Sequence, residues 1–307
     1  MVDIFHCSLP MYDMVEVQKY NDILIKVVGF LIAIKSKEID ASNFSCEEKS
    51  LLAGLLNDDN KFLEANRDNC LDLWKDNDNM LFSHICGQLY YEKYINSLIP
   101  FCTPQFDLDS PIEPGYYNAV IITHKKYAHR YVSLYDETLY DLDSLAGSKL
   151  AINAIDSYSG CVSFCNKVSL GQDVKNIFFH PDVLVTGSHR ASIQAITDEQ
   201  ADVASIDVIT WSLLYRHCPE SVASCVIIGE TGTAPAPPLV ISSALVEKFP
   251  RMADIVKCSV IETLNHLNSP ISVLTDSLNC DILTNLTDAL NALMIKGAVV
   301  FPSTPDY

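Results

Sequence analysis

Asn153-Ala-Ile-Asp-Ser-Tyr-Ser-Gly160 is the stretch that decides the fold, because it follows the apolar run Lys149 to Ile152 with small polar residues and a glycine. Such a pattern is typical of a buried strand that ends in a turn and is followed by a helix. Two similar turns come later in the chain: Thr186-Gly-Ser-His-Arg190 after Val183 to Val185, and Ile206-Asp207 after Ala201 to Ser205. In an open α/β sheet these turns lie where strands end and ligands bind. The sequence therefore predicts a small-anion site assembled from three turns.

A regular alternation of strands and helices surrounds these turns. It predicts a mostly parallel sheet that is covered by helices on both faces. The expected strands are 118–123, 149–152, 183–186, 202–206 and 225–228, with helices from Ser159, Ser188 and Asp207.

Two proline-rich stretches indicate that the chain crosses between two lobes. Thr103 to Pro114 contains three prolines and reads as a loop, and Pro235, Pro237 and Pro238 mark a second crossing. We expect an α/β protein of two Rossmann-like lobes joined by two hinge strands. Lobe 1 is expected to hold residues 1–117 and 236–307, with lobe 2, residues 118–235, inserted into it.

The composition excludes several partners. The 307 residues include 21 lysines and arginines against 39 acidic residues, a formal charge of −18, which repels nucleic acid and anionic membranes. The longest apolar run, residues 27–34, is too short for the roughly 20 residues that span a bilayer, so we expect no membrane insertion.

The cysteines and the chain start bear on location. Eleven cysteines are scattered through apolar segments, and the first residues show neither a basic region nor an export-length apolar stretch. As written, the chain is expected to be cytoplasmic with reduced thiols, or periplasmic if an export signal was removed.

The first turn offers several groups that suit an anion. Ser157 and Ser159 supply hydroxyls, Gly160 allows the backbone to approach a ligand closely, and Asp156 precedes them. The alternative is plain helix capping, which contributes about 1 kcal/mol. Two serines and a glycine exceed what one cap requires, so we interpret Asp156, Ser157, Ser159 and Gly160 as ligand-binding residues.

The second and third turns leave the same two alternatives open. Ser188 and His189 are predicted as donors to the anion, whereas a histidine beside a helix start can also serve only packing or capping. Asp207 is predicted to accept a hydrogen bond from a ligand hydroxyl or amine, or else to cap the following helix.

Four further candidates are predicted from the neighbourhood of the expected cleft. Tyr12, Ser83 and Cys86 follow strand ends of lobe 1, and Tyr117 stands at the expected hinge. Each could contact a ligand or could merely pack.

Catalytic and metal motifs are weak. The sequence contains no Gly-x-Ser-x-Gly elbow, Walker loop or His-Glu-x-x-His motif. Cys161 and Cys165 read better as buried thiols than as metal ligands, because structural zinc usually takes four clustered ligands. We expect no catalytic residue, no metal and no cofactor.

Four motifs in this order resemble the phosphate/phosphonate-binding branch of the type 2 periplasmic binding protein superfamily: Ser8-Leu-Pro-Met-Tyr-Asp13, Asp156-x-Ser-x-Ser-Gly160, Thr186-Gly-Ser-His-Arg-Ala-Ser192 and Ala201-Asp-Val-Ala-Ser-Ile-Asp-Val-Ile-Thr-Trp211. The resemblance implies two α/β lobes that close on a ligand in the cleft, without catalysis. It also implies anion-binding roles for Ser157, Ser159 and His189.

The resulting expectation is a solute-binding protein for a small phosphate-like or phosphonate-like ligand. It would serve an ABC transporter or be a cytosolic relative of such a component, with a permease or a regulatory protein as partner. One alternative is an enzyme of the pyrimidine-precursor (thiamin) synthesis type on the same fold, which would need a reactive His189 with a nearby acid. Another is a ligand-sensing regulatory module.

Overall fold

The computed structural model describes most of the chain from the third strand onward. The described residues are 6–9, 11–12, 63–64, 67–75, 78, 80–106, 112–113, 115–133, 140–169, 183–266 and 271–274.

The chain divides into two compact units. Unit 1 holds the described residues up to Asp107 and again from Ala236, and unit 2 holds those from Leu108 to Pro235. The elements of unit 1 are β1 (His6–Ser8), β2 (Leu63–Glu64), α3 (Arg67–Lys75), β3 (Met80–His84), α4 (Gly87–Leu89), the π-helix η2 (Tyr90–Tyr94), β4 (Leu98–Phe106), β12 (Leu239–Ser242), α9 (Ser243–Lys248), α10 (Pro250–His266) and β13 (Ile271–Leu274).

Unit 2 contains several short helices between its strands. Its elements are β5 (Tyr116–Tyr117), β6 (Ala119–His124), the 3-10 helices η3 (Lys125–Tyr131) and η4 (Leu142–Leu145), β7 (Leu150–Ile152), the π-helix η5 (Tyr158–Val162), α5 (Ser163–Ser169), β8 (Leu184–Val185), α6 (His189–Thr197), β9 (Val203–Asp207), α7 (Val208–His217), α8 (Pro219–Val222), β10 (Cys225–Glu230) and β11 (Ala234–Pro235).

The expected lobe boundaries, after residues 117 and 235, stay a prediction. Strand β5 falls in unit 2 rather than in the first lobe. The physical reason is that β5 pairs antiparallel with β11, which joins Tyr117 to Ala234 within the same unit. Residues 279–307 of the expected first lobe lie outside the described residues.

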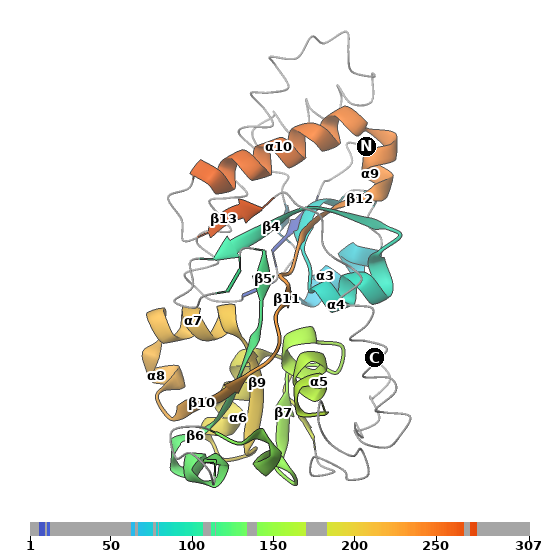
Figure 1. Cartoon of the computed structure of the whole chain (residues 1–307). Helices are drawn as coiled ribbons and strands as arrows, with labels where there is room; N and C mark the ends of the chain where they lie inside the picture. The colour runs from blue at the N-terminus through green and yellow to red at the C-terminus, as the bar shows by residue number, and fades with distance from the viewer. Residues whose placement is uncertain are drawn as a thin grey trace. The chain divides into compact units, whose positions relative to one another are not determined.

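Unit 1 is built on a six-stranded sheet in the order β13-β4-β12-β3-β1-β2. Strands β1, β2 and β3 pair in parallel, whereas β12 pairs antiparallel with both β3 and β4. Helix α10 lies along β13 and β4 on this sheet (Figure 1).

The core of unit 1 explains why α10 forms. Met252, Val256 and Val260 recur at helical spacing and are fully buried, so one face of α10 packs on the sheet residues Phe82 and Ile241. Pro250 begins the helix, a position where its missing N–H costs nothing.

Unit 2 is built on a five-stranded sheet in the order β10-β6-β9-β7-β8. Strand β7 pairs in parallel with β8 and β9, as the alternation predicted, but β6 pairs antiparallel with both of its neighbours. The sheet is therefore mixed rather than simply parallel. Strand β6 enters directly after β5 without a crossover helix, so nothing in the chain requires it to run parallel to β9.

Strand ends in both units carry the residues that start the next helix. The hydroxyls of Ser157, Ser188 and Ser242 and the carboxylate of Asp207 each accept a backbone N–H of the following helix. Short polar side chains at these points satisfy N–H groups that have no partner inside the helix. The positions of these turns thus follow from the local sequence.

One sequence expectation about unit 1 is wrong. The sequence predicts a loop from Thr103 onward, yet β4 continues to Phe106. Its last residues, Thr103 to Phe106, pair antiparallel with β13. Pairing with a distant segment outweighs the poor strand propensity of Pro104, and no local pattern reports that pairing.

Candidate functional site

Two of the three predicted turns are held together by backbone hydrogen bonds in unit 2. The N–H of Thr186 donates to the carbonyl of Ile152 (2.8 Å), and the N–H of Gly187 donates to the carbonyl of Asn153 (2.9 Å). The third turn, at Asp207, ends β9, which pairs directly with β7. The carboxyl ends of β8, β7 and β9 are therefore consecutive along one edge of this sheet.

The first turn folds into a tight entry to η5. Ser157 has an extended backbone, and its Oγ accepts the N–H of Gly160 at 3.2 Å. The carbonyl of Ser157 accepts the N–H groups of both Cys161 and Val162 at 3.1 Å, which is the wide spacing of a π-helix. Ser157, Ser159 and Gly160 are all buried, and Asp156 just before them is half-buried.

A side-chain hydrogen bond joins the first turn to the second. The Oγ of Ser159 lies 3.0 Å from Nε2 of His189. The carbonyl of Ser159 also accepts the hydroxyl of Ser205 on β9 at 2.6 Å and that of Ser163 at 3.4 Å. The structure therefore brings Ser157, Ser159, Gly160 and His189 together. A hydrogen bond from Ser205 connects this group to β9.

The space beside Gly160 is occupied by its neighbours. A Cβ added there would lie 1.7 Å from Oδ1 of Asn153 and 3.2 Å from Cε1 of His189. Any side chain would therefore collide with the Asn153 carboxamide. These contacts join Asn153, Ser157, Ser159, Gly160 and His189, and we call this group of residues the cradle.

Sequence reasoning missed two of the residues that build this arrangement. Asn153 stands in the quoted stretch but is not among the predicted ligand contacts, and Ser205 lies in the fourth motif. Asn153 directly follows a buried strand, which was the available signal. Nothing in the sequence indicated that the hydroxyl of Ser205 would reach the backbone of Ser159.

In addition to Ser157, the structure assigns capping to two further predicted ligand residues. The Oγ of Ser188 accepts the N–H of Ala191 at 3.1 Å and so caps α6. Asp207 is buried, and its Oδ1 accepts the N–H groups of Ile209 (2.8 Å) and Thr210 (3.0 Å). The capping alternative is thus realised at both positions, and a ligand contact at either one stays a prediction.

Tyr117 also belongs to unit 2, where it is buried in β5. Its ring lies against the ring of Tyr158, with the centroids 5.8 Å apart. Burial raises the pKa of the Tyr158 phenol well above its ordinary value. Tyr117 thus packs against Tyr158, the residue between Ser157 and Ser159.

The thiol that follows Gly160 takes part in packing. Cys161 and Cys165 are buried one helical turn apart, and the pKa of Cys161 is raised by a hydrogen bond with Cys165 and by burial. A raised pKa keeps a thiol protonated, which suits a small apolar group better than a metal ligand.

Three predicted residues belong to unit 1. Tyr12 is buried with a φ of 61°, and its ring packs edge-on against Phe106 (centroids 4.9 Å apart). The hydroxyl of Ser83 accepts the indole N–H of Trp74 at 2.9 Å, which is a packing role. Cys86 is half-buried and immediately precedes α4.

A buried histidine, His84, also lies in this part of unit 1. His84 ends β3, and its Nε2 donates to the carbonyl of Pro237 at 3.0 Å. Burial lowers its pKa from 6.5 to about 4, although this hydrogen bond acts in the opposite direction. Its ring also lies 5.8 Å from that of Tyr12.

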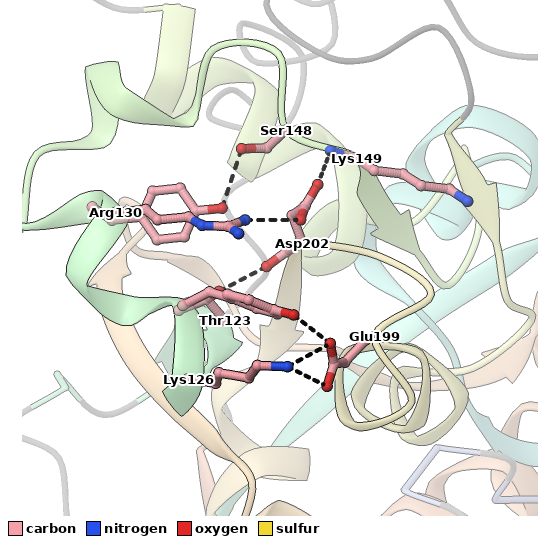
Figure 2. Close-up of polar contacts among 9 residues, drawn as sticks. Thr123, Lys126, Arg130, Ser148, Lys149, Glu199 and Asp202 are labelled. Atoms are coloured by element: carbon pink, nitrogen blue, oxygen red, sulfur yellow. Dashed lines mark hydrogen bonds and ion pairs between the residues drawn. The ribbon is translucent and has the colours of Figure 1, made fainter.

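The opposite end of the unit 2 sheet carries a polar network (Figure 2). Asp202 just before β9 accepts the N–H of Lys149 at 2.8 Å and lies 3.9 Å from Arg130. Glu199 accepts from Lys126 at 3.2 Å and from the hydroxyl of Tyr127. These groups are largely exposed and join η3 to the start of β9, far along the strands from the cradle.

The comparisons with known proteins agree with this architecture. The profile of the family described as "ABC transporter, phosphonate, periplasmic substrate-binding protein" matches residues 100–254. The chain belongs to this family, and the resemblance predicted from the four motifs is confirmed. No curated protein sequence matches the chain.

Solved structures share the fold at low sequence identity. PhnD1 from Prochlorococcus marinus in complex with methylphosphonate has a TM-score of 0.63 at 13% identity, covering 94% of this chain and 98% of that chain. XAC2383 from Xanthomonas citri bound to ATP has a TM-score of 0.58 at 9% identity, with 95% and 98% covered. A binding protein of an ABC phosphonate transporter from Pseudomonas aeruginosa has a TM-score of 0.52 at 16% identity, with 97% and 99% covered.

These findings confirm the type 2 periplasmic binding protein fold and a solute-binding role. The family description names a substrate-binding component and places it in the periplasm. Among the residues that the structure describes, no helix has the length and apolar character needed to cross a bilayer.

Proposed function

We propose that this chain binds a small phosphonate or phosphate in the cradle of unit 2, and that it binds without transforming the ligand. The observation that carries the proposal is the hydrogen bond between Ser159 and His189, which joins two predicted anion-binding turns. Ser157, Ser159 and His189 are the proposed ligand donors.

The chemistry of these groups suits an oxyanion. Hydroxyls and an imidazole N–H are compact donors, and a tetrahedral oxyanion offers several acceptors in one small volume. Because the whole chain carries a formal charge of −18, the binding energy has to come from these local donors and not from the net field. A buried cradle strengthens each hydrogen bond, since water competes less there.

The methylphosphonate complex of the Prochlorococcus marinus protein supports this ligand class. The family description further supports delivery of the ligand to an ABC permease in the periplasm. Ligand contacts by Tyr12, Ser83, Cys86, Tyr117, Asp156, Ser188 and Asp207, and closure of two lobes on the ligand, stay predictions.

Calorimetric titration tests the proposal. Methylphosphonate and inorganic phosphate are titrated into the wild type and into a Ser157→Ala, His189→Ala double variant. We expect the double variant to lose binding, because two of three proposed donors are gone. A matched double variant, Ser212→Ala with His217→Ala on α7, removes the same side-chain types at residues that are not part of the cradle and is expected to bind as the wild type does.

Thermal unfolding supplies an independent measurement. Ligand at a hundred times its dissociation constant is expected to stabilise the wild type by about 2.7 kcal/mol. Unchanged affinity in the cradle double variant would refute the site. Mass spectrometry of the recovered ligand tests the absence of catalysis: an altered ligand would favour the enzymatic alternative.

A further inference from the structure

Asn153 is the least explained residue of the cradle. Its side chain is nine-tenths buried, with a relative exposure of 9%, and its Oδ1 has no hydrogen-bond partner. Leaving a buried acceptor unpaired costs about 1–3 kcal/mol, so native structures rarely keep one without a reason.

The position of this oxygen points to the cradle. Oδ1 lies 1.7 Å from the point where a Cβ on Gly160 would stand, and Cε1 of His189 lies 3.2 Å from the same point. The oxygen therefore lies beside Gly160, on the side of the glycine that also faces the His189 ring. The other groups proposed to meet the ligand, namely the hydroxyls and the imidazole, are able to donate. The amide oxygen can only accept.

An acceptor among donors discriminates between oxyanions. A phosphonate or phosphate monoanion carries a P–OH that can donate to it, whereas a sulfonate has no proton in the accessible pH range. A sulfonate oxygen facing Oδ1 would leave the acceptor unpaired and place two lone pairs against each other.

We propose that Asn153 is a specificity-determining residue that accepts a hydrogen bond from the hydroxyl of a singly protonated phosphonate or phosphate, and so rejects sulfonates. This inference rests on the proposed function and deepens it, because it names the protonation state of the ligand. Binding removes the unpaired acceptor, and part of the affinity comes from that change.

The test compares methylphosphonate with methanesulfonate, which have similar size. We expect the wild type to bind the phosphonate at least about tenfold more tightly, the value of one hydrogen bond to a charged group. Above the second pKa of the phosphonate, its affinity is expected to fall by about tenfold per pH unit, since the fraction of monoanion falls by that factor.

Several titratable groups surround the cradle, and a control separates them from the ligand. His189, Asp156, Cys161 and Asp207 lie on the cradle turns or on the next strand. Methanesulfonate keeps a constant charge, so its binding at raised concentration, measured over the same pH range, reports only these protein groups. The change in methanesulfonate affinity with pH is therefore subtracted from the change in phosphonate affinity with pH.

Variants complete the test. Asn153→Leu keeps the approximate shape and removes the acceptor, so the phosphonate-to-sulfonate ratio is expected to fall about tenfold and the pH profile to flatten. Asn118→Leu is the matched control: Asn118 is also buried, before β6, where its Nδ2 donates to Glu230 at 3.0 Å. Asn118→Leu is expected to leave the ratio of phosphonate affinity to sulfonate affinity unchanged.

The outcomes are distinguishable. If both anions bind equally to the wild type, or if the corrected profile does not follow phosphonate ionisation, the inference is overturned while the proposed function stands. If neither anion binds, both fail. The wild-type profile needs no variant, so the test remains decisive even if Asn153→Leu does not fold.

Discussion

The Oγ of Ser159 lies 3.0 Å from Nε2 of His189, although the two residues are 30 positions apart in the sequence. One belongs to the turn after β7 and the other starts α6 after β8. This contact joins the two predicted anion-binding turns into one arrangement.

The Ser159–His189 contact predicts non-additive binding. Ser159→Ala and His189→Ala are each expected to weaken methylphosphonate binding about tenfold, and the double variant less than the product of the two, because each residue orients the other. We expect a coupling of about 1 kcal/mol in a double-mutant cycle by calorimetry. Additive losses would show that the two residues act independently.

Gly160→Ala is expected to lower both stability and ligand affinity. The new Cβ would lie 1.7 Å from Oδ1 of Asn153, so either the carboxamide or the turn must move. Overpacking of this kind costs about 1–3 kcal/mol, measurable by urea unfolding. Gly232→Ala is the matched control, because an added Cβ there meets nothing within 4 Å. Equal stability of the two variants would contradict the crowding argument.

Two variants of Asp207 distinguish a helix-capping role from a ligand-binding role. Asp207→Ala is expected to cost about 1 kcal/mol of stability, since Ile209 and Thr210 lose their acceptor, whereas Asp207→Ser keeps an N-cap hydroxyl and most of that stability. If Asp207 also contacts the ligand, Asp207→Ser loses affinity while remaining stable. Unfolding curves and calorimetry on both variants separate the two roles.

His84 predicts a specific loss of stability in acid. Its pKa is lowered to about 4 in the folded chain from an ordinary 6.5, so the unfolded chain takes up the proton first as the pH falls. The neutral His84 side chain contributes fully to the free energy of unfolding above pH 6.5. This contribution is lost as the pH falls toward 4, by about 3 kcal/mol at most.

His84→Gln is expected to flatten this part of the pH dependence, since the amide can still donate to the carbonyl of Pro237 but does not titrate. His129→Gln, at an exposed position of η3, is the control and is expected to keep the pH dependence of the wild type. The measurement is urea unfolding at several pH values between 6.5 and 4. An identical slope in wild type and His84→Gln would contradict the assignment.

The network of Figure 2 is expected to be independent of the ligand. Glu199→Gln weakens contacts with Lys126 and Tyr127 at the far end of the sheet, so we expect a small, salt-dependent loss of stability. Methylphosphonate affinity should stay unchanged in calorimetry. A clear loss of affinity would mean that this end of unit 2 is energetically coupled to the cradle.

Much of unit 2 could be predicted because its signals are local. A buried apolar run followed by Ser188 or Asp207 specifies both the strand end and the helix start, since the capping group bonds N–H groups only two or three residues away. The antiparallel β6 and the continuation of β4 past Thr103 were not predictable in this way, because both depend on pairing with distant strands.

The sequence by itself determined where the polar turns fall, which residues begin the helices and, through four ordered motifs, which family the chain belongs to. Only the tertiary structure decided that Ser159 meets His189, that Ser205 supports Ser159, and that Asn153 covers Gly160. The physical reason is the distance along the chain over which each kind of interaction acts. Capping and strand patterns act within a few residues, whereas a binding cradle depends on side chains that become neighbours only when separate strands pair and their ends align.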